Sequence, residues 1–354
     1  MHGELVDGDV EVDDGHVVGV GLAGGTRGRV AVPGFVDLQV NGFAGVDFLA
    51  ASVEDYARAG EALLQSGVTA YQPTFVTAAE STVVEALRIL PGESTGPRII
   101  GAHVEGPFLS GERLGTHPSE YRRDPDLELL DRILDAGRVT EMTVAPELPG
   151  ANALILRLLE RGVVVSAGHT NATAEQARTA FDLGVSTVTH LFNAMRPFRS
   201  RDPGVVGVAL TRPEVFVQMI VDGHHLADET VRLVWAAAGG RVALVSDATA
   251  GAGLGGGSYR LGNVSIEVAG GVPIREDGVL AGTVLTMIDA VRNFHALGIR
   301  FEDAISAATA VPARIVGRPD LGVLELGGAA DIVVLDDRLE IVNVLSAGGA
   351  RVVP

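Results

Sequence analysis

Residues 163–176 read VVVSAGHTNATAEQ and contain one complete structural unit of the chain. The run that begins at Val163 is almost continuously apolar, which is typical of a strand that is buried on both faces. Thr173 and Gln176 then have the spacing of a capping box, which predicts the start of a helix. The stretch therefore predicts a strand that ends near His169 and is followed by a helix.

The same alternation of strand and helix continues along the central part of the chain. The strand candidates, rich in Val, Ile and Thr, are residues 34–40, 68–75, 98–105, 141–146, 163–169, 186–190, 215–221 and 242–247. Helical patterns lie between and after them, at residues 53–65, 80–90, 127–134, 151–159, 229–238 and 285–297. Eight strands separated by crossovers predict an α/β protein with a closed (β/α)8 barrel of the TIM type. A doubly wound sheet is the alternative, but no GxGxxG motif follows the first strand.

The two ends of the chain have a different pattern from the centre. Residues 1–32 and 317–354 contain short strand-like runs and Gly-rich turns, such as Asp14-Gly15. We expect these segments to pair into one small β-sandwich domain, which would bring the termini together, and residues 33–316 to form the catalytic barrel. A glycine-rich loop at residues 251–257 and a hairpin-like insertion up to about Gly282 follow the eighth strand.

The composition excludes several classes of function. The 354 residues include no cysteine and no lysine, which rules out thiolate chemistry, Schiff-base chemistry and a carboxylated-lysine metal bridge. A net charge of −18 argues against nucleic acid or an anionic membrane surface as a partner. The N-terminus has no basic region followed by an apolar run, and no segment is long enough to span a bilayer. We therefore expect a cytoplasmic enzyme.

Unusual polar residues occur where the predicted strands end. They are Gln39 and Asn41, Glu105, His169, His190, His224 and His225, and Asp247. The active sites of barrel enzymes lie at the C-terminal ends of the strands, so these residues should share one face. One carboxylate and two imidazoles match the ligands of a catalytic zinc ion, and a further aspartate can transfer protons. Each residue taken alone could instead be a surface group or a cap, but the joint pattern favours a metal site.

Seven motifs resemble those of the N-acetylglucosamine-6-phosphate deacetylases, a branch of the amidohydrolase superfamily. They are PGFVDLQVNG (33–42), HVEGPF (103–108), GHTNA (168–172), THLFNAM (189–195), DGHH (222–225), SDATA (246–250) and AGTVLTM (281–287). They cover nearly the whole chain, in order. The motifs HxEGP and HLFNAM are specific, whereas PGFVD marks only the superfamily.

The resemblance implies a role for each matching residue. Glu105, His169 and His190 would hold the metal, and Asp247 would act as general base and then as general acid. The residues that would bind the sugar phosphate are Asn193, the backbone of Ala194, Arg201 and His225, and His117 would contact sugar hydroxyls. The arginine that matches Arg201 reaches into the neighbouring subunit's site in the family, which implies a homodimer. Arg196 and Arg199 lie close enough in the sequence to be confused with it.

The end of the first strand departs from the wider superfamily. Many amidohydrolases have His-x-His there and bind a second metal, but this chain has Gln39 and Asn41. Because a glutamine amide is a poor zinc ligand, we predict one divalent ion per subunit and place Gln39 and Asn41 among the substrate-binding residues. Zinc is the first expectation, and the ligand set also accepts iron or another divalent ion.

The expected activity is hydrolysis of N-acetylglucosamine-6-phosphate to glucosamine-6-phosphate and acetate, in amino-sugar catabolism and cell-wall sugar recycling. Three alternatives remain. One is deacetylation of the galactosamine-6-phosphate analogue, and a second is hydrolysis of a cyclic amide, which the missing His-x-His and lysine disfavour. The third is a non-catalytic scaffold, which would be expected to have lost Glu105, His169, His190 or Asp247, and this chain keeps all four.

Overall fold

The computed structural model describes residues 4–22, 28–92, 96–347 and 351–352. Its main sheet is a parallel barrel with the strands in sequence order. The strands are β4 (Phe35–Val40), β7 (Val68–Val76), β9 (Ala102–Glu105), β10 (Val139–Val144), β11 (Val164–Ala167), β12 (Thr187–Val188), β13 (Phe216–Met219) and β14 (Val242–Leu244), and β8 (Arg98–Ile99) also pairs with β7. A parallel bridge between Val40 and Ala248 joins the first strand to the segment after the last. The predicted barrel is confirmed, and the doubly wound alternative is excluded because the strands do not reverse their order.

The strands of the barrel are buried on both faces, as their apolar runs predict. Every residue of β4 and β7 is buried. The side chains alternate between the barrel interior and the helical layer outside, so both sets are removed from water. This leaves the strand ends and the loops that follow them as the places where polar side chains can meet a ligand.

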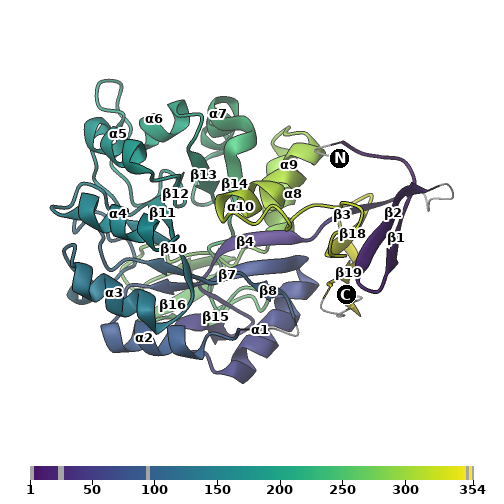
Figure 1. Cartoon of the computed structure of the whole chain (residues 1–354), viewed down its shortest axis with the longest axis horizontal. Helices are drawn as coiled ribbons and strands as arrows, with labels where there is room; N and C mark the ends of the chain where they lie inside the picture. The colour runs from purple at the N-terminus through teal and green to yellow at the C-terminus, as the bar shows by residue number, and fades with distance from the viewer. Residues whose placement is uncertain (1–3, 23–27, 93–95, 348–350, 353–354) are drawn as a thin grey trace.

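Helices surround the barrel (Figure 1). They are α1 (Val53–Gln65), α2 (Glu80–Ile89), α3 (Leu127–Ala136), α4 (Ala151–Glu160), α5 (Ala174–Leu183), α6 (Gly204–Thr211), α7 (Asp228–Ala238), α8 (Met287–Ala296), α9 (Phe301–Ala308) and α10 (Ala310–Ile315). Short 3-10 turns occur at η1 (Phe48–Ala50), η2 (Ser119–Tyr121) and η3 (Gly239–Arg241). The predicted capping box is present at α5, where Thr173 accepts a hydrogen bond from the Gln176 backbone and Gln176 accepts one from the Thr173 backbone. In the described part of the chain, no helix combines the length and the apolar character needed to cross a membrane.

The two ends of the chain form antiparallel sheets beside the barrel, on the right in Figure 1. The strands β1 (Asp9–Asp13) and β2 (His16–Leu22) form a hairpin, and β3 (Arg29–Pro33) pairs with β18 (Ile332–Asp336), β19 (Ile341–Leu345) and β20 (Arg351–Val352) in the order β20-β19-β18-β3. Val17 of the hairpin packs with Ala330 and Ile332. The N-terminal and C-terminal segments thus share a small apolar core. We propose that residues 1–32 and 317–354 form the small domain and that residues 33–316 form the barrel domain.

Two small sheets lie in the loops that follow the C-terminal ends of the first and last barrel strands. The strands β5 (Gly42–Phe43) and β6 (Val46–Asp47) pair directly after β4. The insertion between β14 and α8 is a three-stranded antiparallel sheet of β15 (Gly257–Leu261), β16 (Val264–Ala269) and β17 (Val272–Ile274). Asp47 accepts a hydrogen bond from the Gly262 backbone at 2.7 Å, so this insertion is fixed to the loop that follows the first strand.

Candidate metal centre and active site

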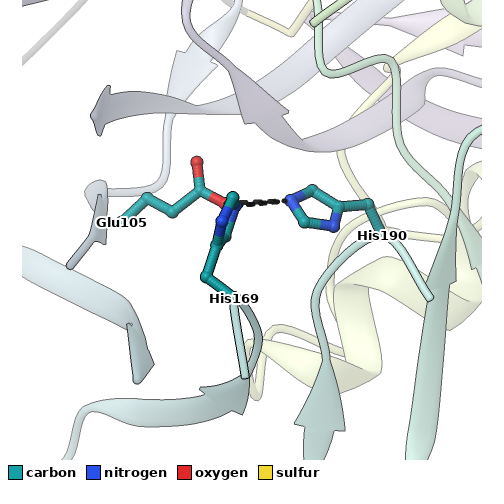
Figure 2. Close-up of side chains that lie close together, drawn as sticks. All are labelled: Glu105, His169 and His190. Carbon is teal, nitrogen blue, oxygen red and sulfur yellow. Dashed lines mark hydrogen bonds and ion pairs between the residues drawn. The ribbon is translucent and has the colours of Figure 1, made fainter. Parts of the chain in front are cut away.

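Three side chains meet at the C-terminal end of the barrel. Glu105 is the last residue of β9, and His169 and His190 each follow a strand by two residues. Glu105 Oε1 lies 3.0 Å from the Nε2 atom of His169 and 3.0 Å from the Nε2 atom of His190. The two Nε2 atoms are 3.2 Å apart, and Figure 2 shows the three side chains pointing toward one common point. The predicted ligands therefore converge, although 85 residues separate Glu105 from His190.

The backbone at these positions adopts an uncommon conformation. His169, His190 and Asp247 have φ angles of 46°, 28° and 50°, in the left-handed region that non-glycine residues rarely occupy. Such residues cost about 1–3 kcal/mol each and concentrate at functional sites. Gly168, which precedes His169, is also required, since a Cβ atom there would lie 2.7 Å from the Thr143 side chain and 2.9 Å from Thr189. The chain therefore turns sharply after each strand, and this turn directs the side chain into the site.

The protonation of His169 follows from its hydrogen bonds. Its Nδ1 atom lies 2.9 Å from the carbonyl oxygen of Arg113, and a carbonyl can only accept, so Nδ1 carries the proton. Burial lowers the pKa of His169 and favours its neutral form, which leaves a lone pair on Nε2. That lone pair faces a carboxylate oxygen and a second imidazole nitrogen. Three such ligand atoms within 4.8 Å of one another fit a divalent cation, and a backbone carbonyl behind one imidazole is typical of metal sites.

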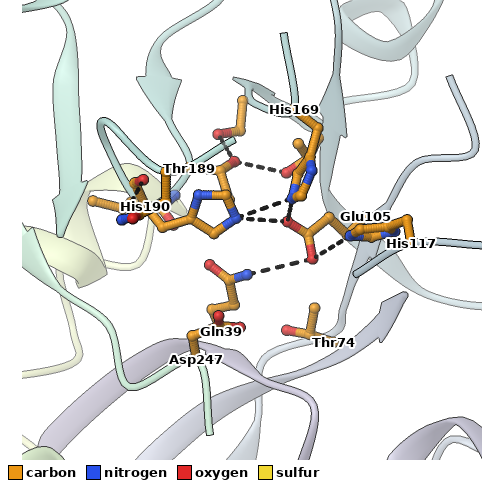
Figure 3. Close-up of polar contacts among 12 residues, drawn as sticks. Gln39, Thr74, Glu105, His117, His169, Thr189, His190 and Asp247 are labelled. Carbon is orange, nitrogen blue, oxygen red and sulfur yellow. Dashed lines mark hydrogen bonds and ion pairs between the residues drawn. The ribbon is translucent and has the colours of Figure 1, made fainter. Parts of the chain in front are cut away.

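The second oxygen of Glu105 has its own partners (Figure 3). Oε2 lies 3.4 Å from Gln39 Nε2 and 3.4 Å from His117 Nε2. His117 Nδ1 accepts a hydrogen bond from the Thr77 backbone at 3.2 Å, so its proton is on Nε2 and points at Glu105. Burial disfavours charge on Glu105, yet His169 and His117 hold its pKa well below the usual value. His117 is thus a neighbour of the cluster in this structure, and its contact with sugar hydroxyls stays a prediction.

Asp247 lies at the same end of the barrel, three residues after β14. Its Oδ1 atom accepts a hydrogen bond from Asn41 Nδ2 at 2.7 Å. Burial raises the pKa of Asp247 to about 6, against the opposing effects of His190 and His225. The carboxyl group is therefore ionised at neutral pH, but it is a stronger base than a surface aspartate. This suits a group that accepts a proton and later returns it.

The residues expected to bind the sugar phosphate lie in the loops that surround the cluster. Asn193 donates to the His190 carbonyl at 3.2 Å, and Ala194, with φ 50°, accepts from the Thr170 backbone at 3.1 Å. His225 Nδ1 lies 2.7 Å from Asp222 Oδ2. Arg201 is exposed in the loop before α6, and no contact within the described residues joins its side chain to the cluster. The structure therefore brings Asn193, Ala194 and His225 close to the cluster, but not Arg201.

Arg196 and Arg201 differ in their side-chain contacts. Arg196 forms an ion pair of 2.6 Å with Asp202, so its guanidinium is already occupied. Arg201 has no ion pair within the described part of the chain, which leaves it available to a ligand or to a second subunit. This separates Arg201 from Arg196, with which the sequence alone confuses it.

A buried polar network adjoins the cluster, and the sequence motifs did not predict a role for it. His103 is fully buried, and its Nε2 atom lies 2.7 Å from Thr143 Oγ1, which lies 2.7 Å from Thr189 Oγ1. Burial lowers the pKa of His103 to about 4, so the ring is neutral. The alternation of side chains along β9 could have predicted that His103 lies near the site, because residues two apart in a strand face the same side. His103 and Glu105 therefore both face the barrel interior.

Comparisons with known proteins identify the family of this chain. The amidohydrolase family model matches residues 30–350. The chain belongs to the amidohydrolase family. This amidohydrolase is 38% identical over 333 residues to the N-acetylglucosamine-6-phosphate deacetylase of Mus musculus, a match that covers 89% of this chain and 81% of the mouse enzyme. It is also 34% identical over 324 residues to the N-acetylgalactosamine-6-phosphate deacetylase of Escherichia coli O157:H7, with 89% of this chain and 86% of that enzyme covered.

A solved structure supports the barrel assignment of this amidohydrolase. The N-acetyl-D-glucosamine-6-phosphate deacetylase of Mycobacterium smegmatis, in the form of an aspartate-to-alanine mutant, superposes with a TM-score of 0.89 at 37% identity. The match covers 96% of this chain and 93% of that one. That mutant was solved in complex with N-acetyl-D-glucosamine-6-phosphate. The family resemblance that the motifs predicted is therefore confirmed.

Proposed function

We propose that this amidohydrolase removes the acetyl group from N-acetylglucosamine-6-phosphate and releases acetate and glucosamine-6-phosphate. The observation that carries the proposal is the convergence of Glu105, His169 and His190 beside Asp247. The similarity to enzymes named for this reaction identifies the substrate class. His169, His190 and Asp247 are buried and have strained backbone conformations at one end of the barrel. A non-catalytic scaffold would gain nothing from this strain.

Glu105, His169 and His190 would hold one divalent ion, for which zinc is our first expectation and iron or another divalent metal an alternative. When bound there, such an ion would polarise the acetyl carbonyl and lower the pKa of a water molecule. The Arg113 carbonyl keeps Nε2 of His169 available, and Gln39 and His117 hold the second oxygen of Glu105. Gln39 in place of a histidine supports a single ion.

Asp247 would move the protons of the reaction. Asn41 occupies its Oδ1 atom, and Oδ2 has no hydrogen-bond partner among the described residues, so Oδ2 is the atom that accepts the proton of the attacking water. The same carboxyl group then protonates the nitrogen as the C–N bond breaks. His225, held by Asp222, would stabilise the negative charge on the carbonyl oxygen.

The phosphate would be a remote anchor that orients the amide. Asn193, the backbone of Ala194 and His225 would bind the sugar phosphate from one subunit, with His225 at its acetyl group, and Arg201 would reach the phosphate from the neighbouring subunit of a homodimer. A guanidinium suits this role because its planar fork forms paired hydrogen bonds with phosphate. Arg201 has no ion pair among the described residues, and this supports its action across an interface. A cytoplasmic location stays a prediction.

The galactosamine-6-phosphate analogue is a second candidate substrate, because this chain resembles an enzyme named for it almost as closely. The two sugars differ at one hydroxyl group. A cyclic amide has weaker support, since the chain lacks the His-x-His motif and the lysine that such relatives carry.

The deciding experiment follows acetate release by proton NMR from three compounds. They are N-acetylglucosamine-6-phosphate, N-acetylgalactosamine-6-phosphate and unphosphorylated N-acetylglucosamine, each with protein of known metal content. We expect rapid turnover of the first, weak turnover of the sugar without phosphate, and one metal ion per chain. Preference for the galactose epimer would replace the first substrate with the second. No acetate from any of them, with metal bound, would refute the deacetylase proposal.

Subunit mixing tests the position of Arg201. The variants Arg201→Ala and Asp247→Asn should each be almost inactive. If Arg201 acts across a twofold interface, mixed dimers contain one intact site, and refolding equal amounts together should restore about a quarter of wild-type activity. No recovery, with mixed dimers shown by native mass spectrometry, would place Arg201 in its own subunit's site or outside the reaction.

A further inference from the structure

Glu147 makes two short hydrogen bonds that the reaction described above does not use. It follows β10 by three residues, at the same end of the barrel as the metal ligands. Its Oε2 atom accepts a hydrogen bond from Thr170 Oγ1 at 2.5 Å, and its Oε1 atom accepts one from the Asn171 backbone at 2.6 Å. Both donors belong to the two residues that directly follow His169. A single carboxylate on the neighbouring strand end therefore holds the chain immediately after a proposed metal ligand.

The segment that Glu147 holds needs external support. His169 is in the left-handed conformation, which persists only where surrounding contacts impose it. Backbone contacts hold part of the turn, since Ser110 donates to the His169 carbonyl at 2.9 Å and Thr170 donates to the Ala194 carbonyl at 3.1 Å. They leave the Thr170 hydroxyl, which is fully buried, and the Asn171 amide, which is half-buried, to bond with Glu147. Without Glu147 these two donors would lose their partner.

The contacts of Glu147 also lead back to the imidazole ring of His169. Asn171, whose backbone Glu147 binds, accepts hydrogen bonds on Oδ1 from Nε and a terminal nitrogen of Arg113, both at 3.2 Å. The carbonyl oxygen of Arg113 accepts the Nδ1 proton of His169. Together with Thr170, which donates to Glu147 and is covalently bonded to His169, these residues form a closed ring in which the peptide bond between His169 and Thr170 is one of the links. It sets both the backbone conformation of His169 and the position of the group that orients its ring.

We propose that Glu147 is a positioning residue for the metal site, which acts by holding His169 in the conformation that directs Nε2 at Glu105. This inference rests on the proposed function, because it requires a metal ion on the three ligands. A carboxylate is suited to the role, since it only accepts hydrogen bonds and its two oxygens match the two donors. Residues that orient metal ligands in this manner typically change metal affinity 10- to 100-fold when they are replaced.

The test measures metal binding by the full-length protein with Co²⁺ as the probe. Chelator competition gives the affinity, and the visible absorption of Co²⁺ reports the geometry of its ligands. Glu147→Ala should bind Co²⁺ about 10- to 100-fold more weakly and with shifted absorption bands. Glu147→Gln should stay close to wild type, because its amide oxygen can accept from Asn171 while Thr170 turns to accept from the amide nitrogen. Glu160→Ala, which removes an exposed carboxylate on α4, is the control.

The outcomes separate this inference from the proposed function. Wild-type affinity and spectrum in Glu147→Ala would overturn the positioning role while leaving the metal site intact. Equal Co²⁺ binding by wild type and His169→Ala would overturn both the positioning role and the proposed metal site, because the ion would then lie elsewhere. If Glu147→Ala does not fold, Thr170→Val removes the Thr170 hydrogen bond to Glu147 with little change of shape, together with the bond that Thr170 Oγ1 accepts from the Ala172 backbone. Weaker Co²⁺ binding by Thr170→Val with normal binding by Glu147→Gln would support the role, and unchanged binding by Thr170→Val would overturn it.

Discussion

Replacing Asp247 by asparagine is the sharpest test of the proposed chemistry. The change keeps the shape of the side chain and an oxygen that can still accept the 2.7 Å hydrogen bond from Asn41. It removes the basic oxygen that takes the proton of the attacking water. Glu105, His169 and His190 remain in place, so metal content should be unchanged. Any loss of turnover then reports proton transfer rather than loss of the site.

The size of the expected effect follows from the role assigned to Asp247. Burial raises the pKa of this carboxyl group to about 6, which makes it an effective proton acceptor near neutral pH. Loss of general acid–base catalysis typically reduces the rate by about 10²- to 10⁴-fold, or about 3 to 5 kcal/mol in the barrier. We therefore expect kcat to fall by that factor while the metal content, measured by mass spectrometry, stays at the wild-type level.

The assay compares initial rates of acetate release at saturating N-acetylglucosamine-6-phosphate. Asp126→Asn is a matched control, because Asp126 caps α3 by accepting hydrogen bonds from the backbones of Glu128 and Leu129, and asparagine caps helices equally well. That variant should keep wild-type kcat. Turnover by Asp247→Asn within tenfold of wild type, with the metal retained, would refute the assignment of Asp247 as the proton-transfer group.

Three further predictions concern stability. Removing the metal with a chelator should lower the free energy of unfolding by about 2.7 kcal/mol, relative to protein at a free-metal concentration about 100 times the Kd of the metal. An unchanged Tm in calorimetry would contradict a bound ion. Burial raises the pKa of Glu141 from 4.5 to about 8, so between these values only the unfolded chain loses this proton, and Glu141 should contribute a fall in stability of about 1.4 kcal/mol per pH unit. Glu141→Gln should reduce the overall slope by that amount in urea unfolding between pH 5 and 8, and equal slopes would contradict the titration of Glu141. Thr173→Ala should lower the free energy of unfolding by about 1 kcal/mol, because it removes the capping box of α5, whereas Thr173→Ser should keep most of that stability. Equal urea midpoints for wild type and both variants would show that the cap does not stabilise the protein.

The sequence predicted most of the barrel because its strands are local patterns. The run from Val163 and the capping box at Thr173 each depend on residues a few positions apart, and both are present in the structure. The helix α6 was not predicted. All seven residues from Gly204 to Leu210 are buried, so the segment has no polar face and no helical periodicity to recognise.

The amino-acid sequence by itself determined the strand order of the barrel and the identity of the candidate ligands, because strand ends and short motifs are readable along the chain. Only the tertiary structure decided how those ligands are oriented. The hydrogen bond from His169 to the Arg113 carbonyl, the pairing of His117 with Glu105 and the ring closed by Glu147 join residues far apart in sequence. Several of these contacts use backbone atoms, which every residue carries, so no residue type marks them in advance. They exist only once the folded barrel brings its strand ends together.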